Sequence, residues 1–320
     1  MDNRRKIYLK ILLSLLAFVP ISLLHAQQEA HIVHNMYNNV SINPGFVGSV
    51  AGICATGIYH QQWAGFKDSY DHNVAPVTYL INIHAPVNIL HGGVGASIYQ
   101  DNLGYSKEIG VKIMYAYRTD LGMGNLGIGV QLDFLNATYD FAGLREGAKD
   151  DNDPLLQGNE ESSMVFDAGF GIQYFVPEKF YIGLSSTRLL ESTATNINYT
   201  YKRHYFFSGG YTWAFPNSPS FVLEPTVLIK SDLIKTQFDI AALLKYNNKV
   251  WGGVSYSTWG NMDPISVLLG LKIKDIKIGY SYSIPTSKIG SSGGHEVLVG
   301  YCFKIEMDRG RRSYRNTRFL

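Results

Sequence analysis

The chain has 320 residues, of which 46% are hydrophobic and 13% aromatic, and a formal net charge of +2. Its two cysteines, Cys54 and Cys302, are too few for a disulfide framework and indicate no structural zinc site. After the N-terminal region no apolar run approaches the length of a membrane-spanning helix, so a helical membrane protein is not expected.

The first residues have the pattern of a secretory signal peptide. Arg4, Arg5 and Lys6 belong to a basic region, and residues 11–24 form an apolar core that is short for a spanning helix. The small residue before position 27 suits a cleavage site. We therefore expect residues 1–26 to be a signal peptide. The mature chain would then begin with residues 27–50, which are polar and predict an irregular periplasmic lead-in.

Residues 51–307 alternate with a period of two. Apolar side chains alternate with small or polar ones in residues 276–284, and residues 296–305 repeat the pattern after a Gly/Ser loop. Successive side chains of a strand point to opposite faces, and runs of about ten residues can cross a bilayer as tilted strands. Fourteen strands are predicted at residues 52–61, 76–87, 92–101, 106–118, 125–139, 163–175, 179–188, 202–215, 220–231, 236–246, 250–259, 264–273, 276–284 and 296–305.

The connections between these strands alternate in length. Short turns rich in Pro, Gly, Asn and Asp alternate with longer loops, of which residues 62–75 and 140–162 are examples. Short periplasmic turns and longer outer loops are typical of bacterial outer-membrane barrels, which have even strand numbers. The sequence therefore predicts an all-β protein, a fourteen-stranded antiparallel transmembrane β-barrel with both ends in the periplasm.

Motifs for catalysis or ligand binding have simpler interpretations. The G-x-G-x-x-G pattern at residues 122–127 leads into a strand rather than a helix, which favours a hairpin turn over a dinucleotide site. The acidic loop at residues 140–162 lacks the spacing of an EF-hand and is interpreted as a solvated outer loop. No nucleophile occurs in a recognisable context with a base. We expect no enzymatic activity, no cofactor or metal ion, and no nucleic-acid partner.

Two regions are candidate partner-binding surfaces. The first is the outer loops, because binding residues concentrate on loops held by a rigid scaffold. Its candidates are Trp63, Phe66, Glu146, Asp150, Asp151, Asp153, Glu160 and Glu161. The second is the tail at residues 308–320, which holds five Arg and one Asp and is expected in the periplasm. Arginine together with aromatic residues is typical of interface anchors. The tail candidates are Arg311, Arg312, Tyr314, Arg315, Arg318, Phe319 and Leu320.

The two cysteines are candidates for a pair at the closing seam of the barrel. In a closed antiparallel barrel the first and last strands are neighbours. Cys54 is near the start of the first strand and Cys302 near the end of the last, so both are expected at the periplasmic rim. A disulfide would fasten the seam, whereas a register shift of one residue would place the two thiols on opposite faces.

Several short motifs follow one another in an order that is informative as a whole. Residues 43–48 read Asn-Pro-Gly-Phe-Val-Gly, and residues 61–66 read Gln-Gln-Trp-Ala-Gly-Phe. The later motifs are Glu224-Pro225, Gln237-Phe238-Asp239, Trp251-Gly252-Gly253, Gly279-Tyr280-Ser281-Tyr282, Gly294-His295-Glu296 and the final Arg318-Phe319-Leu320. Together they resemble the PorP/SprF family over nearly the whole mature chain, with Val47 where a smaller residue is usual.

This resemblance implies an outer-membrane protein of the Bacteroidetes type IX secretion system, a system linked in some members to gliding motility. It implies an accessory barrel, embedded in outer-membrane lipid, that helps to secrete or hold a large surface protein bearing a type IX C-terminal domain. It also implies a connection to a periplasmic lipoprotein that binds peptidoglycan. The alternative is a passive porin or small-solute channel, which needs an open polar lumen. The inward positions mix Gly, Ser and Lys with Leu298 and Met114 and do not decide between the two.

Overall fold

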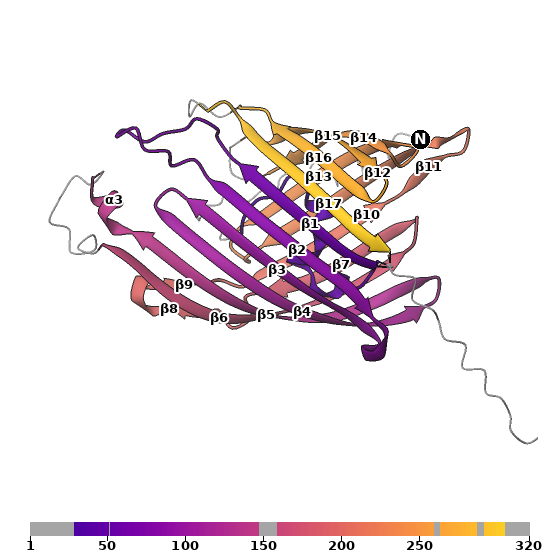
Figure 1. Cartoon of the computed structure of the whole chain (residues 1–320), viewed down its shortest axis with the longest axis horizontal. Coiled ribbons are helices and arrows are strands. Elements are labelled where there is room, and N and C mark those ends of the chain that lie inside the picture. The colour runs from indigo at the N-terminus through magenta and orange to yellow at the C-terminus, as the bar shows by residue number, and fades with distance from the viewer. Residues whose placement is uncertain (1–28, 51, 147–158, 259–262, 287–290, 305–320) are drawn as a thin grey trace, which may run out of the picture.

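The computed structural model describes residues 29–50, 52–146, 159–258, 263–286 and 291–304. Within them, fourteen wall strands form a closed antiparallel β-barrel (Figure 1), as the sequence predicted. Each wall strand pairs with its neighbours in the chain, and the pairing of the first strand with the last closes the ring. β1 (Gly52–Gln61) pairs with β17 (Gly294–Lys304), and β10 (His204–Tyr211) pairs with β12 (Ser218–Ser231).

The other wall strands follow the predicted positions, with boundary differences at several ends. They are β2 (Val77–Val87), β3 (Gly92–Leu103), β4 (Ser106–Leu121), β5 (Gly124–Asp140), β6 (Glu160–Val176), β7 (Phe180–Thr187), β13 (Thr236–Tyr246), β14 (Val250–Ser257), β15 (Ile265–Ile273) and β16 (Ile276–Ser283). The predicted strand at residues 202–215 is divided into β10 and the short β11 (Trp213–Phe215). β11 continues on β12 in the register of β10, as the pairs Gly210–Thr226 and Trp213–Leu223 show, so the two form one wall strand interrupted at Thr212. A register shift follows between Ala214 and Phe215.

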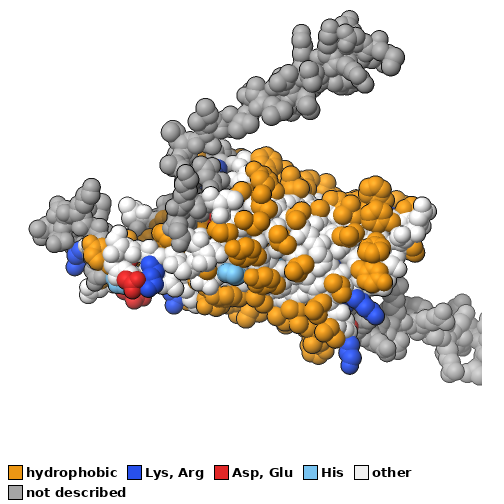
Figure 2. All heavy atoms as spheres, turned by 90° about the horizontal axis from the view of Figure 1, so that it is seen from above, with side chains coloured by type: hydrophobic (Ala, Val, Ile, Leu, Met, Phe, Trp, Pro, Cys, Tyr) orange, Lys and Arg blue, Asp and Glu red, His pale blue; other side chains and the backbone are white. Residues whose placement is uncertain are grey.

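The alternation of the sequence becomes the two faces of the wall. On β17, Val297 and Val299 are 40% and 48% exposed, whereas Glu296 and Leu298, which alternate with them, are almost fully buried. Exposed and buried residues alternate in this way because successive side chains of a strand point to opposite faces of the sheet. Figure 2 shows the outward apolar side chains covering the middle of the wall, with Lys and Arg side chains near its ends. This outer surface suits contact with lipid.

The two ends of the barrel differ in their connections. At one end, here called the turn end, the strands are joined by short turns, including η3 (Asn88–Leu90). At the other, the loop end, longer connections include α3 (Phe141–Glu146), the hairpin of β8 (Thr193–Ala194) and β9 (Tyr199–Thr200), and η5 (Thr195–Ile197). The predicted long connections are therefore at the loop end, but the β3–β4 and β12–β13 connections at that end are also short, so the alternation of lengths is only partial. In the described part of the chain, no helix has the length and apolarity needed to cross a membrane.

The lead-in differs from its prediction. Residues 29–50, hereafter the plug, lie inside the barrel (Figure 1) and form η1 (Asn35–Tyr37), α2 (Asn39–Ile42) and η2 (Pro44–Phe46). Its polar composition suggested a solvated periplasmic segment, yet much of it is buried. The physical reason is that the inner wall is itself polar, so the irregular backbone finds hydrogen-bond partners there instead of in water.

Candidate functional site: the plugged lumen

The plug runs through the lumen from the loop end to the turn end. Its first described residue, Glu29, forms an ion pair with Arg188, which directly follows β7 at the loop end. Near its last residues, Gly48 lies against Gly93, at the turn end of β3. The described N-terminal end therefore lies at the opposite end of the barrel from the end of β17. The termini themselves, in residues 1–28 and 305–320, lie outside the described residues, so the shared periplasmic location of both termini stays a prediction.

Charged groups hold the plug at the loop end. Arg188 Nε lies 3.1 Å from Glu29 Oε1, and its Nη2 lies 3.0 Å from Glu108 Oε1 on β4. Lys230 Nζ on β12 donates to the Glu29 carbonyl at 2.9 Å, and the Tyr201 hydroxyl donates to Glu108 Oε2 at 2.7 Å. Buried charges are costly unless they are paired, and this network pairs the charges of Glu29, Arg188 and Glu108 with groups from three sides of the wall.

One carboxylate binds the plug a few residues further along the chain, at Val33 and His34. Glu296 of β17 accepts hydrogen bonds from the backbone N–H groups of Val33 and His34, at 2.8 and 2.7 Å. It also contacts His34 Nδ1 at 2.6 Å and His60 Nδ1 at 3.2 Å. His34 and Glu296 are 0% and 1% exposed. A charged acceptor that pairs with two backbone donors fixes both the position and the direction of the plug.

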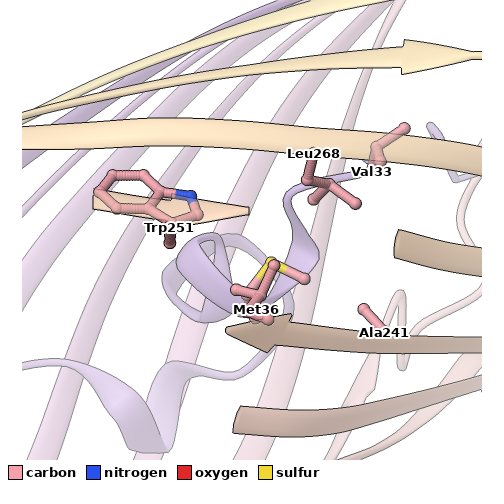
Figure 3. Packing of buried hydrophobic residues seen from close by; sticks show 6 residues of the cluster. Val33, Met36, Ala241, Trp251 and Leu268 are labelled. Carbon is pink, nitrogen blue, oxygen red and sulfur yellow. The ribbon is translucent and has the colours of Figure 1, made fainter. Parts of the chain in front are cut away.

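Apolar packing fills the space around these polar contacts. Val33 and Met36 of the plug pack against Trp251 and Leu268 of β14 and β15, together with Ala241 of β13 (Figure 3). On the other side of the plug, Ile32 packs against Ile58, Leu80 and Leu298. These contacts place the apolar side chains of the plug against two neighbouring sectors of the wall, β13 to β15 and β17 to β2, which are separated by β16. Leu298 and the other apolar inward residues thus serve as packing partners of the plug.

The wall makes room for the plug with glycines at close approaches. A Cβ on Gly129 of β5 would lie 2.4 Å from the carbonyl carbon of Pro44. A Cβ on Gly93 would lie 2.4 Å from the Cα of Gly48, which itself has a φ of +74°. Any larger residue would collide with plug backbone, which cannot move aside as a flexible side chain can. The backbone of residues 43–48 therefore packs directly against wall positions that are occupied by glycine.

The wall positions of Gly93 and Gly129, which receive residues 43–48 of the plug, are hereafter called the glycine seat. Polar side chains add hydrogen bonds to it. Asn43 Nδ2 donates to the Ile172 carbonyl at 3.1 Å, while its Oδ1 accepts from Gly45 N–H at 2.8 Å. Arg118 Nη1 of β4 donates to the carbonyls of Gly45 and Val47, at 3.2 and 3.4 Å. These bonds occupy backbone groups that the short turns of the plug leave unpaired.

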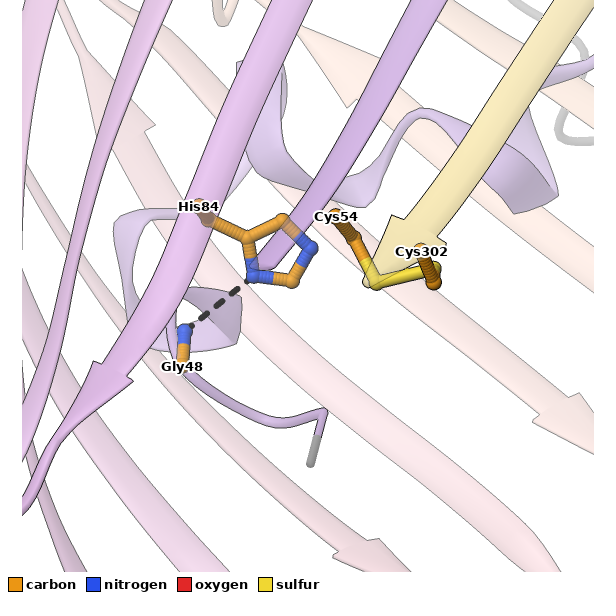
Figure 4. The surroundings of a disulfide bond; sticks show 4 residues. All are labelled: Gly48, Cys54, His84 and Cys302. Carbon is orange, nitrogen blue, oxygen red and sulfur yellow. Dashed lines mark hydrogen bonds between the residues drawn. A yellow bond between two sulfur atoms is a disulfide. The ribbon is translucent and has the colours of Figure 1, made fainter. Parts of the chain in front are cut away.

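The cysteines lie where the plug leaves the lumen and enters the wall. Cys54 and Cys302 are directly opposite partners in the β1–β17 register, with Cα atoms 4.1 Å apart, and a disulfide joins them (Figure 4). Beside them, the Gly48 N–H donates to His84 Nδ1 at 3.3 Å. The bond therefore ties the closing seam at the turn end, next to the exit of the plug.

A vestibule opens at the loop end above the plug. It encloses about 1190 Å³, counted to its open mouth, and Glu29, Ala30 and His31 form part of its floor. Its walls include Gln62, Leu103, Tyr139 and Tyr199, from the β1–β2 loop, the β3–β4 hairpin, β5 and the β8–β9 hairpin. The vestibule is therefore bounded by several connections of the loop end together with the first residues of the plug.

The β1–β2 loop beside this vestibule is fastened to the neighbouring hairpin. The Tyr105 hydroxyl donates to Asp68 Oδ2 at 2.5 Å, and the backbone N–H groups of Tyr70 and His72 donate to Asp68 Oδ1, each at 2.9 Å. The hydrogen bond from Tyr105, with those backbone bonds, lowers the pKa of Asp68 to about 2. Asp68 therefore remains ionised, and its hydrogen bonds intact, over the ordinary range of pH.

The structure places some of the predicted partner-binding residues. Trp63 and Phe66 lie in the β1–β2 loop, half-buried, with ring centroids 6.1 Å apart. Glu160 and Glu161 are exposed at the start of β6, and Glu146 is the last residue of α3. All are at the loop end. Asp150, Asp151 and Asp153 lie outside the described residues, as do the tail residues Arg311, Arg312, Tyr314, Arg315, Arg318, Phe319 and Leu320.

The plug and its partners Glu296, Arg188 and Glu108 were missed by sequence reasoning. One signal was present, because Ile32, Val33 and Met36 are apolar residues within a stretch otherwise rich in Asn and His. A solvated lead-in has no need of them. Their spacing indicates neither a strand nor a long helix, however, so it gives no location for the segment.

Comparison with solved structures supports the fold. The Ralstonia pickettii toluene transporter TbuX is 12% identical with a TM-score of 0.54, over 83% of this chain and 93% of that one. A TodX deltaS2S3 mutant, described as a monoaromatic hydrocarbon channel, is 11% identical with a TM-score of 0.50, over 83% and 94% of the two chains. At such identities the likeness is one of fold alone. Comparison with curated protein sequences finds no significant match.

The family model described as type IX secretion system membrane protein PorP/SprF matches residues 24–301. This range contains the plug and all fourteen wall strands up to residue 301 of β17, including the Asn-Pro-Gly-Phe-Val-Gly motif in its glycine seat. The barrel architecture agrees with a location in the outer membrane. The chain belongs to the PorP/SprF family and is an outer-membrane component of the type IX secretion system.

Proposed function

We propose that this protein is an accessory barrel that binds and anchors, or helps to export, a large secreted surface protein bearing a type IX C-terminal domain. We further propose that it links this partner to a peptidoglycan-binding lipoprotein in the periplasm. In this arrangement the loop end faces outward and the turn end faces the periplasm. The observation that carries the proposal is the plug, which fills the lumen from one end of the barrel to the other.

A filled lumen favours binding over passive transport. A porin needs a continuous aqueous channel. Here Glu296, the Arg188 network and the glycine seat hold the plug at three depths, so opening would require breaking buried polar contacts at each of them. The porin alternative is therefore the weaker proposal. A barrel with a filled lumen can still bind partners at its two rims, which are held by the rigid wall.

The outer rim is the proposed contact for the surface protein. Trp63, Phe66, Glu160 and Glu161 lie at the loop end, and the vestibule opens between the loops that carry them. Aromatic side chains supply much of the binding energy in protein interfaces, and loops on a rigid barrel hold such residues in place. The Arg-rich tail is the proposed contact on the periplasmic side, where arginine side chains recognise carboxylates bidentately.

Deletion of residues 146–161 tests the outer contact. The barrel should remain inserted, because the deleted segment contains only the first two residues of β6, while the surface partner should be released into the medium. Immunoblotting of cells and medium would measure this, with deletion of residues 233–234 in the short β12–β13 loop as the matched control. Full retention of the partner by the larger deletion would exclude this loop as the contact.

A further inference from the structure

The inner wall at the turn end carries a one-sided group of lysines. Lys245 of β13, Lys272 of β15 and Lys277 of β16 all alternate with outward apolar residues and therefore face the lumen. Lys249 and Lys274 extend the group in the adjacent turns and are exposed. These five residues are named the lysine face.

The arrangement of the lysine face costs stability in the barrel itself. Lys272 and Lys277 are directly opposite partners across β15 and β16. Like charges in opposite positions repel, and the stabilising choice would be an acidic residue at one of the two. Lys277 lies over the Tyr37 ring of the plug, with Nζ 4.1 Å from the centroid, whereas Lys272 is exposed.

The described counter-charges nearby are too few to balance these lysines. Lys245 forms an ion pair with Glu224 of β12, and Asp275 lies in the turn between β15 and β16. Among the described residues of β12 to β16 at the turn end, two carboxylates therefore face five ammonium groups. A surplus of positive charge on one sector of a mouth raises the local concentration of anions.

We propose that the lysine face is a docking surface for an acidic segment of a periplasmic protein, which meets it at the turn end of the barrel. This rests on the proposed orientation, in which the turn end faces the periplasm. Anionic lipid headgroups meet the outer side of the wall, whereas Lys245, Lys272 and Lys277 are turned to the inner side. A protein segment can contact the exposed Lys249, Lys272 and Lys274 at the turn end, and its carboxylates supply the charges that the wall lacks.

Binding of a fluorescein-labelled octaglutamate peptide to the full-length protein in phosphatidylcholine nanodiscs tests this proposal. The double variant Lys272→Gln/Lys277→Gln should bind the peptide roughly three- to tenfold more weakly than wild type at low salt. The difference should shrink at about 0.5 M salt, because such contacts are screened. The matched control, Lys107→Gln/Lys179→Gln, removes the same charge at two exposed positions outside the face and should bind like wild type.

Three further binding measurements distinguish the lysine face from other causes of weaker binding. Lys272→Gln alone, which leaves the Tyr37 contact in place, should show part of the loss if the double variant is perturbed. The loss should persist when Arg311, Arg312, Arg315 and Arg318 are replaced with Ala. Equal weakening in the control, or displacement of the peptide by phosphatidylglycerol in the nanodisc, would overturn the proposal. If the lysine variants bind normally while deletion of residues 146–161 releases the surface partner, the inference fails and the proposed function stands.

Discussion

At the scale of single residues, Glu296 holds the plug more directly than any other side chain. Its carboxylate accepts from two backbone N–H groups and contacts two histidine rings, all within the lumen. This role could not be predicted from the sequence, because a Glu on the inward face of a strand is ordinary in a barrel with a wet lumen. Its partners lie more than two hundred and thirty positions away in the chain, beyond the reach of local patterns.

Replacing Glu296 with Gln should weaken the binding of the plug to the wall without changing the volume of the side chain. The amide keeps the size of the side chain but loses the charge and one acceptor, so we expect a loss of about 2–4 kcal/mol in unfolding free energy. Denaturant titration in detergent micelles would measure it. Glu160→Gln, at an exposed position, is the matched control and should change stability by less than about 0.5 kcal/mol. Equal effects of the two substitutions would contradict the role of Glu296.

At the scale of elements, the wall strands were predictable and the plug was not. Alternation of Ile276, Ile278 and Tyr280 with Lys277 and Gly279 follows directly from the geometry of a strand between lipid and lumen. The plug has no such period, since its short turns are shaped by contacts with the wall. The motif at residues 43–48 could be noted in the sequence, but its seat became visible only when Gly129 and Gly93 were seen against it.

Replacing Gly129 with Ala should displace the plug. The new methyl group would meet the Pro44 carbonyl at 2.4 Å, and relief requires movement of backbone, for which we expect a cost of about 1–3 kcal/mol. The matched control is Gly252→Ala on β14, where the added Cβ would have its nearest neighbour, a Leu269 side-chain atom, at 3.5 Å. Protease cleavage of the plug in the folded barrel should increase for Gly129→Ala alone. Identical cleavage in both variants would show that the seat is not tight.

The disulfide between Cys54 and Cys302 remains a prediction for the protein in its membrane. It should appear as a linked peptide in mass spectrometry of unreduced protein, since the periplasm is oxidising. Replacing both cysteines with Ser should lower the unfolding free energy by roughly 2–4 kcal/mol, because the bond closes a loop of almost the whole barrel. Reduction of wild type should reproduce this loss and leave the double variant unchanged. Free thiols in protein extracted without reductant would contradict the bond.

At the scale of the whole molecule, fold class, strand number and family follow from the sequence because they rest on local alternation and ordered motifs. The state of the lumen does not, because Leu298, Met114 and the inward lysines are compatible with a channel or with a packed interior. The structure resolves this alternative by placing residues 29–50 among them. The central claim is therefore that the wild-type barrel is closed by its own N-terminal segment, and we propose that it acts through its two rims.

Single-channel recording of the purified wild-type protein in planar bilayers tests this claim most directly. We predict no steady conductance for wild type. A variant lacking residues 29–46 should conduct where it assembles, because its lumen keeps polar walls but loses the plug. The conductance of this variant also shows how large a current an open lumen of this barrel would carry. A stable, open-pore conductance of the wild-type protein would contradict the account and favour the porin alternative.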